Sequence, residues 1–600
     1  MLDTTAATRI QSVLSSLDSA LADENLDAAL ELFADTCYWR DLVSFTWNIK
    51  TVEGKDQIRD MLGQCLANVS PHAWQVDESE PAVVEDGVAE GWIRFETAVA
   101  RGYGYIRLKD GLIWTLLTTM VDLKGYEEPA GDSRPLGAKH GDRQGEMTWK
   151  EEREEELATL GFETQPYVVV IGGGQGGIAL GARLRQIGVP AIIVEKDERP
   201  GDAWRKRYKS LCLHDPVWYD HLPYIKFPKN WPVFSPKDKV ADWLEMYTRV
   251  MELNYWGGTE AKSAQYDETT GTWSVLVERD GQTIELKPSH LVLATGMSAK
   301  PNIPAIEGQD VFQGVQEHSS RHKGPDGLRG KRVAVIGSNN SAHDICAALC
   351  ESDVDVTMIQ RSSTHISRSE SLMKYALGPL YSEEAVRNGI STEKADLIFA
   401  SIPYALLADF QKPVFDEIRE QDADFYRALE DAGFMLDFGP DNSGLFMKYL
   451  RRASGYYIDV GASQLIIDGK IKLASGSEVN RLTENSVLLE DGREIPADIV
   501  IYATGYGSMN GWAADLISQD VADKVGKVWG LGSDTPKDPG PWEGEERNMW
   551  KPTQQKALWF HGGNLAQSRH YSHYLALQLK ARMEGLSTPV YGLQTVHHKS

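Results

Sequence analysis

A short apolar segment runs directly into a glycine-rich turn at Val168-Val169-Val170-Ile171-Gly172-Gly173-Gly174-Gln175-Gly176-Gly177. An apolar strand followed by Gly-x-Gly-x-x-Gly and a helix is typical of dinucleotide-binding folds. Gly172 allows the tight turn, Gly174 lets a pyrophosphate approach the backbone, and Gly177 allows close packing of the helix. The helix N-terminus adds free N–H groups and a positive dipole. We therefore expect a dinucleotide site here.

A second turn of the same kind differs from the first in the residue that ends the next strand. After the first turn, the strand at 191–194 ends in Glu195. A carboxylate there accepts hydrogen bonds from ribose hydroxyls. After the second turn, at 333–342, the strand at 354–360 ends in Arg361. Because arginine suits a 2'-phosphate, the chain is predicted to bind two dinucleotides, of which FAD and NADPH are the obvious pair.

The second turn also departs from the motif. It begins with Gly337, but Asn339 replaces the middle glycine and Ser341 and Ala342 occupy its end. Asparagine tolerates a positive φ better than other residues that carry a side chain, so we expect the turn to form. Gly337, Asn339, Ser341 and Arg361 are the predicted NADPH-binding residues. The alternative is a turn that keeps only its structural role.

Length and composition narrow the class of protein. Six hundred residues exceed a single core, so several domains are expected. The net charge of -25 argues against a nucleic-acid or anionic-membrane partner, because both require a basic surface. No apolar run is long enough to predict a membrane span. The five scattered cysteines fit reduced thiols and a cytoplasmic location, and no metal site is predicted.

The pattern changes along the chain and predicts an N-terminal module and a linker. Residues 1–125 combine two helical stretches with later alternating strands. They resemble the NTF2-like (SnoaL-like) domain, a small α+β cone. Residues 126–164 are rich in glycine, proline and charge and are interpreted as a linker. The module could bind a small ligand, shield the site or mediate dimerisation, and dimerisation or packing is the preferred interpretation.

From residue 165 onward, strands alternate with helices, which predicts an α/β fold with parallel sheets covered on both faces. We expect two nested Rossmann-type domains. Residues 165–325 and 469–600 are predicted to form the FAD domain, with 498–502 as one of its closing strands. Residues 326–468 are predicted to form the NADPH domain, with a helical insertion.

Four further stretches carry a family resemblance. They are 200–208, with Trp204 and Arg205; 211–216, with His214; Phe312-x-Gly314-x-x-x-His318; and 560–569, with Asn564. In this order they resemble the class B flavoprotein monooxygenases, specifically the flavin-containing monooxygenase group with the YUCCA-type enzymes nearby. The resemblance covers about 165–585. It departs from the family at the end of the third motif, where this chain has His322 and the family has tyrosine or phenylalanine.

The resemblance implies an activity. In such enzymes NADPH reduces FAD, the reduced flavin takes up O₂ as a C4a-(hydro)peroxide, and one oxygen passes to a small organic substrate. Trp204, Arg205, Thr504 and Gly505 join the predicted cofactor-binding residues. His214, at the flavin-edge position, and Asn564 are the candidate catalytic residues. For His214, a core or phosphate-contacting role is the alternative.

The type of oxygenation stays open at this stage. N- or S-oxygenation, or a YUCCA-like oxidation of an α-keto acid, is preferred to Baeyer–Villiger oxidation. Tyr208 is not followed by Pro-Gly, and the third motif does not end in tryptophan. A disulfide reductase would need a cysteine pair after the first turn, where Cys212 stands alone. A non-catalytic NADPH-binding sensor is the alternative from another class. The partners expected are the substrate and O₂, with a homodimer as a further prediction.

Overall fold

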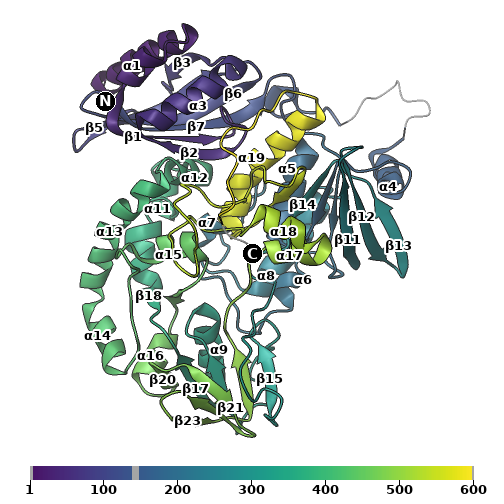
Figure 1. Ribbon diagram of the computed structural model, residues 1–600, viewed down its shortest axis with the longest axis vertical. Helices are drawn as coiled ribbons and strands as arrows, with labels where there is room; N and C mark the ends of the chain where they lie inside the picture. Colours follow the sequence, from purple (N-terminus) through teal and green to yellow (C-terminus); the bar gives the residue numbers. More distant parts are fainter. Residues whose placement is uncertain (1–3, 138–146, 598–600) are drawn as a thin grey trace.

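The computed structural model describes residues 4–137 and 147–597. Figure 1 shows three stacked regions, with the N-terminal domain (purple) at the top, one nucleotide-binding domain in the middle and the other at the bottom. A group of helices, drawn in green, lies along one side. Within the described residues no helix is long and apolar enough to cross a membrane.

The N-terminal domain is a curved sheet covered by helices. Its strands follow the order β2-β1-β7-β6-β5-β3, with β4 pairing β5, and only β1 and β7 run parallel. The strands are β1 (Phe33–Leu42), β2 (Ile49–Glu53), β3 (His72–Val76), β4 (Val83–Glu85), β5 (Val88–Glu96), β6 (Ala100–Lys109) and β7 (Leu112–Leu123). The helices are α1 (Thr4–Ala22), α2 (Leu26–Glu31) and α3 (Gly54–Val69). This is the helix-then-sheet arrangement predicted for the module.

The interior of this cone is filled by its own aromatic side chains. Trp39, Phe45, Trp74 and Phe95 are all at most 3% exposed. Trp74 and Phe95 stack at a centroid distance of 4.6 Å. A Cβ added to Gly102 would lie 2.2 Å from the Phe95 ring, so even a methyl group has no room there. The packing favours a structural role for the cone over binding of a ligand inside it.

The linker contains one helix, α4 (Trp149–Thr159), which includes the acidic run. Thr148 and Glu151 form a reciprocal capping box at its start. No residue of α4 is buried, as expected for a solvated connector.

The first nucleotide-binding domain has a five-stranded parallel sheet of order β10-β9-β8-β14-β25. The strands are β8 (Val168–Ile171), β9 (Ala191–Val194), β10 (Tyr255–Trp256), β14 (His290–Leu293) and β25 (Leu558–Phe560). A separate sheet of three antiparallel strands packs against one face: β11 (Thr259–Asp267), β12 (Thr272–Arg279) and β13 (Gln282–Leu286). The domain's helices include α5 (Gln175–Gln186), α6 (Asp202–Arg205), α7 (Val217–Asp220), α8 (Lys237–Val250), α17 (Asn510–Leu516), α18 (Gln519–Val525) and α19 (Leu565–Met583).

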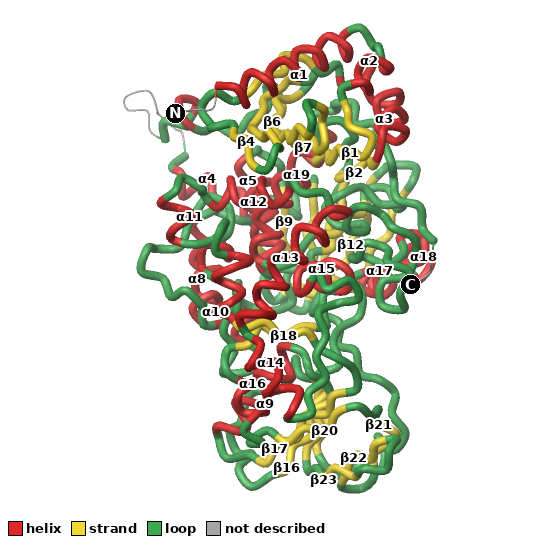
Figure 2. Tube along the Cα trace, turned by 90° about the vertical axis from the view of Figure 1, so that its left-hand side faces the viewer, coloured by secondary structure: helices red, strands yellow, loops and turns green. Residues whose placement is uncertain are grey.

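The second domain has a parallel sheet of order β15-β24-β16-β17-β20. The strands are β15 (Val315–His318), β16 (Arg332–Ile336), β17 (Asp355–Gln360), β20 (Lys472–Ser475) and β24 (Ile499–Tyr502), with helices α9 (Asn340–Glu351) and α16 (Ala462–Ile467). A small antiparallel sheet of β21 (Val479–Leu482), β22 (Ser486–Leu489) and β23 (Glu494–Pro496) lies at the same end, as Figure 2 shows.

The strand pairing corrects one prediction. The segment 498–502 was expected to close the first domain, but β24 lies between β15 and β16 in the second sheet. The chain therefore returns to the first domain after Tyr502 rather than near Gly469, and β15 already belongs to the second sheet. A fully apolar strand fits the centre of either parallel sheet, so its composition could not distinguish them. The rest of the domain division stays a proposal.

The helical insertion lies between the N-terminal domain and the second sheet (Figure 1). Its helices are α11 (Glu383–Arg387), α12 (Thr392–Ala400), α13 (Tyr404–Gln421), α14 (Ala423–Asp431) and α15 (Gly444–Arg452). Two short parallel strands, β18 (His365–Arg368) and β19 (Tyr456–Asp459), flank it. A π-helical turn at Leu372–Leu377 follows α10 (Ser369–Ser371). The insertion predicted from the sequence is thus helical.

Candidate functional site

Three adjacent strands of the first sheet, β8, β14 and β25, end at one edge. A Cβ added to Gly172, whose φ is +110°, would lie 2.3 Å from the carbonyl oxygen of Ala294. One added to Gly177 would lie 2.0 Å from the Gly172 oxygen. These two glycines are therefore required by packing. A Cβ on Gly174 would meet nothing within 4 Å, which leaves the backbone open to a ligand. Each glycine occupies the geometry that the sequence predicted for it.

Glu195 lies at the end of β9 beside this turn. Its Oε2 accepts a hydrogen bond from the Gly173 N–H at 2.6 Å, and its Oε1 accepts one from the Asp197 N–H at 2.9 Å. Burial raises the pKa of Glu195, and the two backbone hydrogen bonds oppose the rise. The hydroxyl of Thr295, after β14, is buried without a hydrogen-bond partner among the described residues. An open glycine backbone, a fixed carboxylate and an unpartnered hydroxyl fit the pyrophosphate and ribose of FAD.

Trp204 and Arg205 lie on the short helix α6. Trp204 packs against the core of the first domain. The guanidinium of Arg205 contacts three carboxylates, those of Asp202 at 3.0 Å, Asp242 at 2.9 Å and Glu245 at 2.6 Å. Because both terminal nitrogens of Arg205 are engaged in these contacts, the side chain stabilises the segment around α6. Its predicted contact with the cofactor stays a proposal.

The second turn repeats the geometry of the first. Gly337 has a φ of +132°, and a Cβ there would lie 2.3 Å from the Ala503 oxygen. Asn339 caps α9 with a φ of -99° and a ψ of -169°, so its backbone is extended and no positive φ is needed. The prediction that Asn339 is suited to the turn because asparagine tolerates a positive φ is therefore wrong. Gly174 is extended in the same way, with a φ of -76°. The backbone at the middle position of the turn is therefore one that any residue can adopt. A small side chain is needed there only to leave space for a ligand.

Around Arg361 the structure gathers positive charge from distant segments. The Arg361 side chain is 60% exposed, and its one ion pair among the described residues, to Glu478, is long at 3.9 Å. Desolvation lowers the pKa of Lys537, and the positive charges of Arg452 and Arg361 lower it further. Neither Arg452 nor Lys537 has a carboxylate within ion-pair distance in the part of the chain that the structure describes. Three poorly neutralised cations fit a 2'-phosphate. The sequence analysis missed two of them, because their separation in the chain gives no signal.

Ser341, Thr504 and Gly505 complete the predicted set on this side. Ser341 lies in the first turn of α9. The Thr504 hydroxyl donates a hydrogen bond to the Asn302 oxygen at 2.5 Å, and the Gly505 oxygen accepts one from His318 at 3.0 Å. Thr504 and Gly505 therefore connect the two segments that cross between the domains, and their contact with a cofactor stays a proposal.

His214 lies where the two nucleotide domains meet. Its Nε2 is 3.4 Å from Oδ1 of Asp344, on α9 of the second domain. The hydroxyl of Tyr208 donates to the other oxygen of Asp344 at 2.7 Å. Burial lowers the pKa of His214, but the hydrogen bond and charge of Asp344 outweigh it, so that the net pKa is raised. The sequence analysis named His214 but missed Asp344, since the two lie on separate domains.

Asn564 is the N-cap of α19. Its Oδ1 accepts from the Gln567 N–H at 2.9 Å, and its Nδ2 donates to the Tyr219 hydroxyl at 3.1 Å. The capping box explains the residue structurally, while the bond to Tyr219 connects it to the segment that carries His214. A catalytic role for Asn564 stays a proposal.

A carboxylate without a partner lies beside this segment. Asp215 is partly exposed and has no hydrogen bond within the described residues. Burial raises the pKa of Asp215 to about 6, opposed by the charge of His214. Burial also raises the pKa values of Tyr219, Tyr449 and Tyr456, and the charge of Asp215 adds to each of these shifts. We call Asp215 with these three tyrosines the Asp215 cluster.

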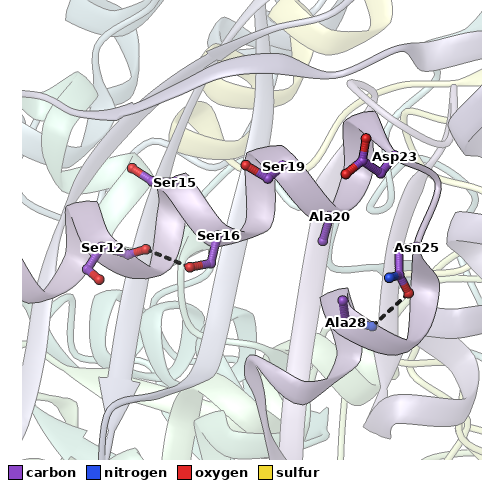
Figure 3. Close-up of a pocket in the computed structure, with 8 residues that line it drawn as sticks. All are labelled: Ser12, Ser15, Ser16, Ser19, Ala20, Asp23, Asn25 and Ala28. Atoms are coloured by element: carbon purple, nitrogen blue, oxygen red, sulfur yellow. Dashed lines mark hydrogen bonds between the residues drawn. The ribbon is translucent and has the colours of Figure 1, made fainter.

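One other hollow lies far from both turns, between α1 and α2 on the N-terminal domain. Figure 3 shows that four serines and Ala20 of α1, Asp23 and Asn25 of the connecting turn, and Ala28 of α2 line it. Ser16 donates to the Ser12 oxygen at 3.1 Å, and Asn25 caps α2. The bonds of Ser16 and Asn25 are thus ordinary helix contacts, and the hollow lies apart from both turns.

Comparisons with known proteins identify the family. A model described as pyridine nucleotide-disulphide oxidoreductase matches residues 169–403, and a SnoaL-like domain model matches residues 13–116. Indole-3-pyruvate monooxygenase YUCCA1 of Oryza sativa subsp. japonica is 30% identical over 368 residues, which cover 60% of this chain and 82% of the relative. The chain belongs to the flavin-dependent monooxygenases. This monooxygenase is an enzyme that uses FAD and NADPH and carries an N-terminal NTF2-like domain.

A second relative and one solved structure are also similar to this chain. Indole-3-pyruvate monooxygenase YUCCA6 of Arabidopsis thaliana is 29% identical over 379 residues, covering 60% of this chain and 83% of the relative. A structure of ε-caprolactone-bound cyclohexanone monooxygenase superposes with a TM-score of 0.50 at 19% identity, covering 70% of this chain and 88% of the other. That likeness shows the fold alone. The monooxygenase acts on a small molecule and O₂.

Proposed function

We propose that this monooxygenase transfers one oxygen atom to a small organic substrate by N- or S-oxygenation, or by oxidation of an α-keto acid. The observation that carries the proposal is the pair of matched turns, one beside the carboxylate of Glu195 and one beside the cation of Arg361. The relatives' printed names favour a keto acid. Baeyer–Villiger oxidation is the less supported alternative. A homodimer and a cytoplasmic location stay predictions.

Each group of residues has a definite task in this proposal. When bound, FAD and NADPH supply the redox chemistry that activates O₂. Gly174 and the α5 N-terminus would hold the FAD pyrophosphate, and Glu195 would hold its ribose. Arg361 would hold the 2'-phosphate of NADPH.

His214, whose pKa is raised by the hydrogen bond and charge of Asp344, offers a ring N–H donor at the meeting point of the domains. Asp344 orients the ring through Nε2. Because Tyr208 also donates to Asp344, the geometry of this donor depends on the relative position of both domains.

The charge of the Asp215 cluster bears on the choice of substrate. An ionised carboxylate without a hydrogen-bond partner repels an anionic substrate and attracts a cationic one. The tyrosine rings around it offer faces that favour cations or neutral aromatic groups. If the substrate contacts this cluster, the electrostatics favour N- or S-oxygenation of a neutral or cationic compound over oxidation of a keto acid.

The first prediction concerns the cofactor and the reaction. Purified protein should be yellow, NADPH should bleach the flavin anaerobically, and air should restore the colour. NADPH consumption across amines, thioethers, ketones and keto acids, with product mass read for one added oxygen, then identifies the substrate class. A colourless protein that still binds NADPH would contradict the proposed oxygenation reaction and would favour a non-catalytic NADPH-binding sensor.

A second prediction tests Asp215 with three thioethers of one skeleton: 4-(methylthio)benzylamine, methyl p-tolyl sulfide and 4-(methylthio)benzoate. The reacting sulfur is common to all three, and only the remote charge differs. We expect kcat/KM to fall from the ammonium to the carboxylate compound. Asp215→Asn should reduce the ratio between them about tenfold, equivalent to about 1.4 kcal/mol.

The control is Asp416→Asn, which removes the same charge from an ion pair on α13 with a 66% exposed side chain. An unchanged ratio in Asp215→Asn would mean that the substrate does not meet the Asp215 cluster.

A further inference from the structure

The C-terminal end of α12 is held by two arginines of the N-terminal domain. Arg40, on β1, donates from Nη1 to the Ala400 oxygen at 2.8 Å. Arg107, on β6, donates to the Ser401 oxygen at 3.0 Å and to its hydroxyl at 2.9 Å. The last carbonyls of a helix have no partner within it and form the negative end of its dipole. Two guanidiniums from another domain therefore satisfy and anchor this helix end.

Both arginines are buried and form ion pairs, Arg107 within the N-terminal domain and Arg40 with the C-terminal part of the chain. Arg40 is 1% exposed and forms an ion pair with Glu545 at 2.6 Å, and its guanidinium lies 4.5 Å from the centre of the Tyr404 ring. Arg107 is 7% exposed and pairs with Glu90 at 2.9 Å. These two buried side chains therefore fix the end of α12 relative to β1 and β6, because any movement would leave a charge or a carbonyl without a partner.

The other side of α12 connects to the Asp215 cluster through Arg569. Asp396 accepts two hydrogen bonds from Arg569 of α19, at 2.9 and 2.8 Å. Arg569 also donates to the carbonyl oxygens of Tyr219 and His221, each at 2.6 Å. Tyr219 is the residue whose hydroxyl accepts from Asn564. The contacts thus run without a gap from the N-terminal domain through α12 and α19 to the Asp215 cluster.

We propose that the N-terminal domain is a positioning element of the monooxygenase, in which Arg107 and Arg40 act through α12 and Arg569 to keep the Tyr219–Asn564 side of the flavin site closed to water. This inference rests on the proposed function, because it needs an oxygen-transferring site to close. Arg107 and Arg40 are positioning residues and touch neither substrate nor cofactor. The filled cone interior agrees with this role.

Loosening of this closure would divert NADPH from productive turnover to a second reaction that forms hydrogen peroxide. In productive turnover, substrate, O₂, NADPH and one proton give oxygenated substrate, NADP⁺ and water. In the leak, O₂, NADPH and one proton give NADP⁺ and hydrogen peroxide, and no oxygen reaches the substrate. Entry of water at the site favours the leak. The fraction of NADPH that ends as peroxide therefore reports on the closure.

The test compares two arginines of one strand in the full-length protein. Arg101 also lies on β6, but it pairs with Asp122 and Glu127 on its own side, at 2.8 and 2.7 Å. With methyl p-tolyl sulfide, Arg107→Ala should raise the peroxide fraction several-fold, Arg107→Lys should restore part of the coupling, and Arg101→Ala should match wild type. Bound FAD is measured in each variant.

The outcomes separate the two proposals. If Arg107→Ala lowers the melting temperature but leaves the peroxide fraction at the wild-type value, the domain is only structural and the inference is wrong. If Arg107→Ala fails to fold, Ser401→Ala removes one acceptor from the catalytic side and should raise the peroxide fraction in the same direction, with an unchanged fraction overturning the inference. Wild-type protein that oxidises no NADPH would instead contradict the proposed function.

Discussion

Replacing Gly174 with leucine should give a folded but colourless protein. A Cβ at this position meets nothing within 4 Å and the backbone φ is an ordinary -76°, so the protein itself tolerates the side chain. The leucine would occupy the space in which the pyrophosphate approaches the backbone. We expect bound FAD to fall to about a tenth or less of the wild-type amount, because a steric block costs more than one lost charge-assisted hydrogen bond of about 1.5–3 kcal/mol.

The measurement is the flavin absorbance per mole of protein, with circular dichroism to confirm folding. Gly63→Leu is the matched control, since Gly63 lies exposed on α3, and it should keep its FAD. Gly177→Ala should instead damage the fold, because its Cβ would lie 2.0 Å from the Gly172 oxygen. A yellow Gly174→Leu protein would place the FAD pyrophosphate somewhere other than the first turn.

Arg361→Glu should weaken NADPH binding by about a hundredfold, or about 2.7 kcal/mol. The change removes one cation from the group with Arg452 and Lys537 and adds an anion where the 2'-phosphate is expected. Binding of NADH, which has no 2'-phosphate, should change little, so the preference for NADPH over NADH should collapse. FAD content should be unaffected, because the two sites lie on different sheets.

The readout is the KM for each nicotinamide cofactor in the NADPH-oxidation assay. Arg329→Glu is the control, since Arg329 is an 80% exposed arginine of the same domain whose partner is Asp353. An unchanged KM for NADPH in Arg361→Glu would mean that the second cofactor lies elsewhere, and the three cations would then need another explanation.

Local sequence was sufficient where the physical constraint is itself local. The roles of Gly172 and Gly177 could be predicted because a turn between a strand and a helix brings the same backbone atoms together in any such fold. The positions of Glu195 and Arg361 directly after β9 and β17 could be predicted for the same reason, and their contacts with a cofactor stay proposals. Where the argument assumed a conformation, as for the φ of Asn339, it was wrong although the turn formed.

Long-range placement could not be predicted in the same way. The apolar composition of β24 fits a central parallel strand but does not name its sheet. Asp344 meets His214 across a domain boundary, and Arg452 and Lys537 lie near Arg361 although they are far from it in the chain; no periodicity of the sequence indicates such contacts. Asn564 was named from a family resemblance; its capping bond to Gln567 is local, whereas its bond to Tyr219 emerges only from the packing of α19.

The sequence by itself determined that this protein has two strand–turn–helix segments, each followed by a strand that ends in a residue of opposite charge, because glycine geometry and the residue at a strand end act within a few residues. The tertiary structure decided which sheet each strand joins, which cations surround Arg361, and how Arg40 and Arg107 connect the N-terminal domain to the flavin site. Those features depend on burial and on the pairing of charges far apart in the chain. The free energy of such contacts exists only once the domains have packed together.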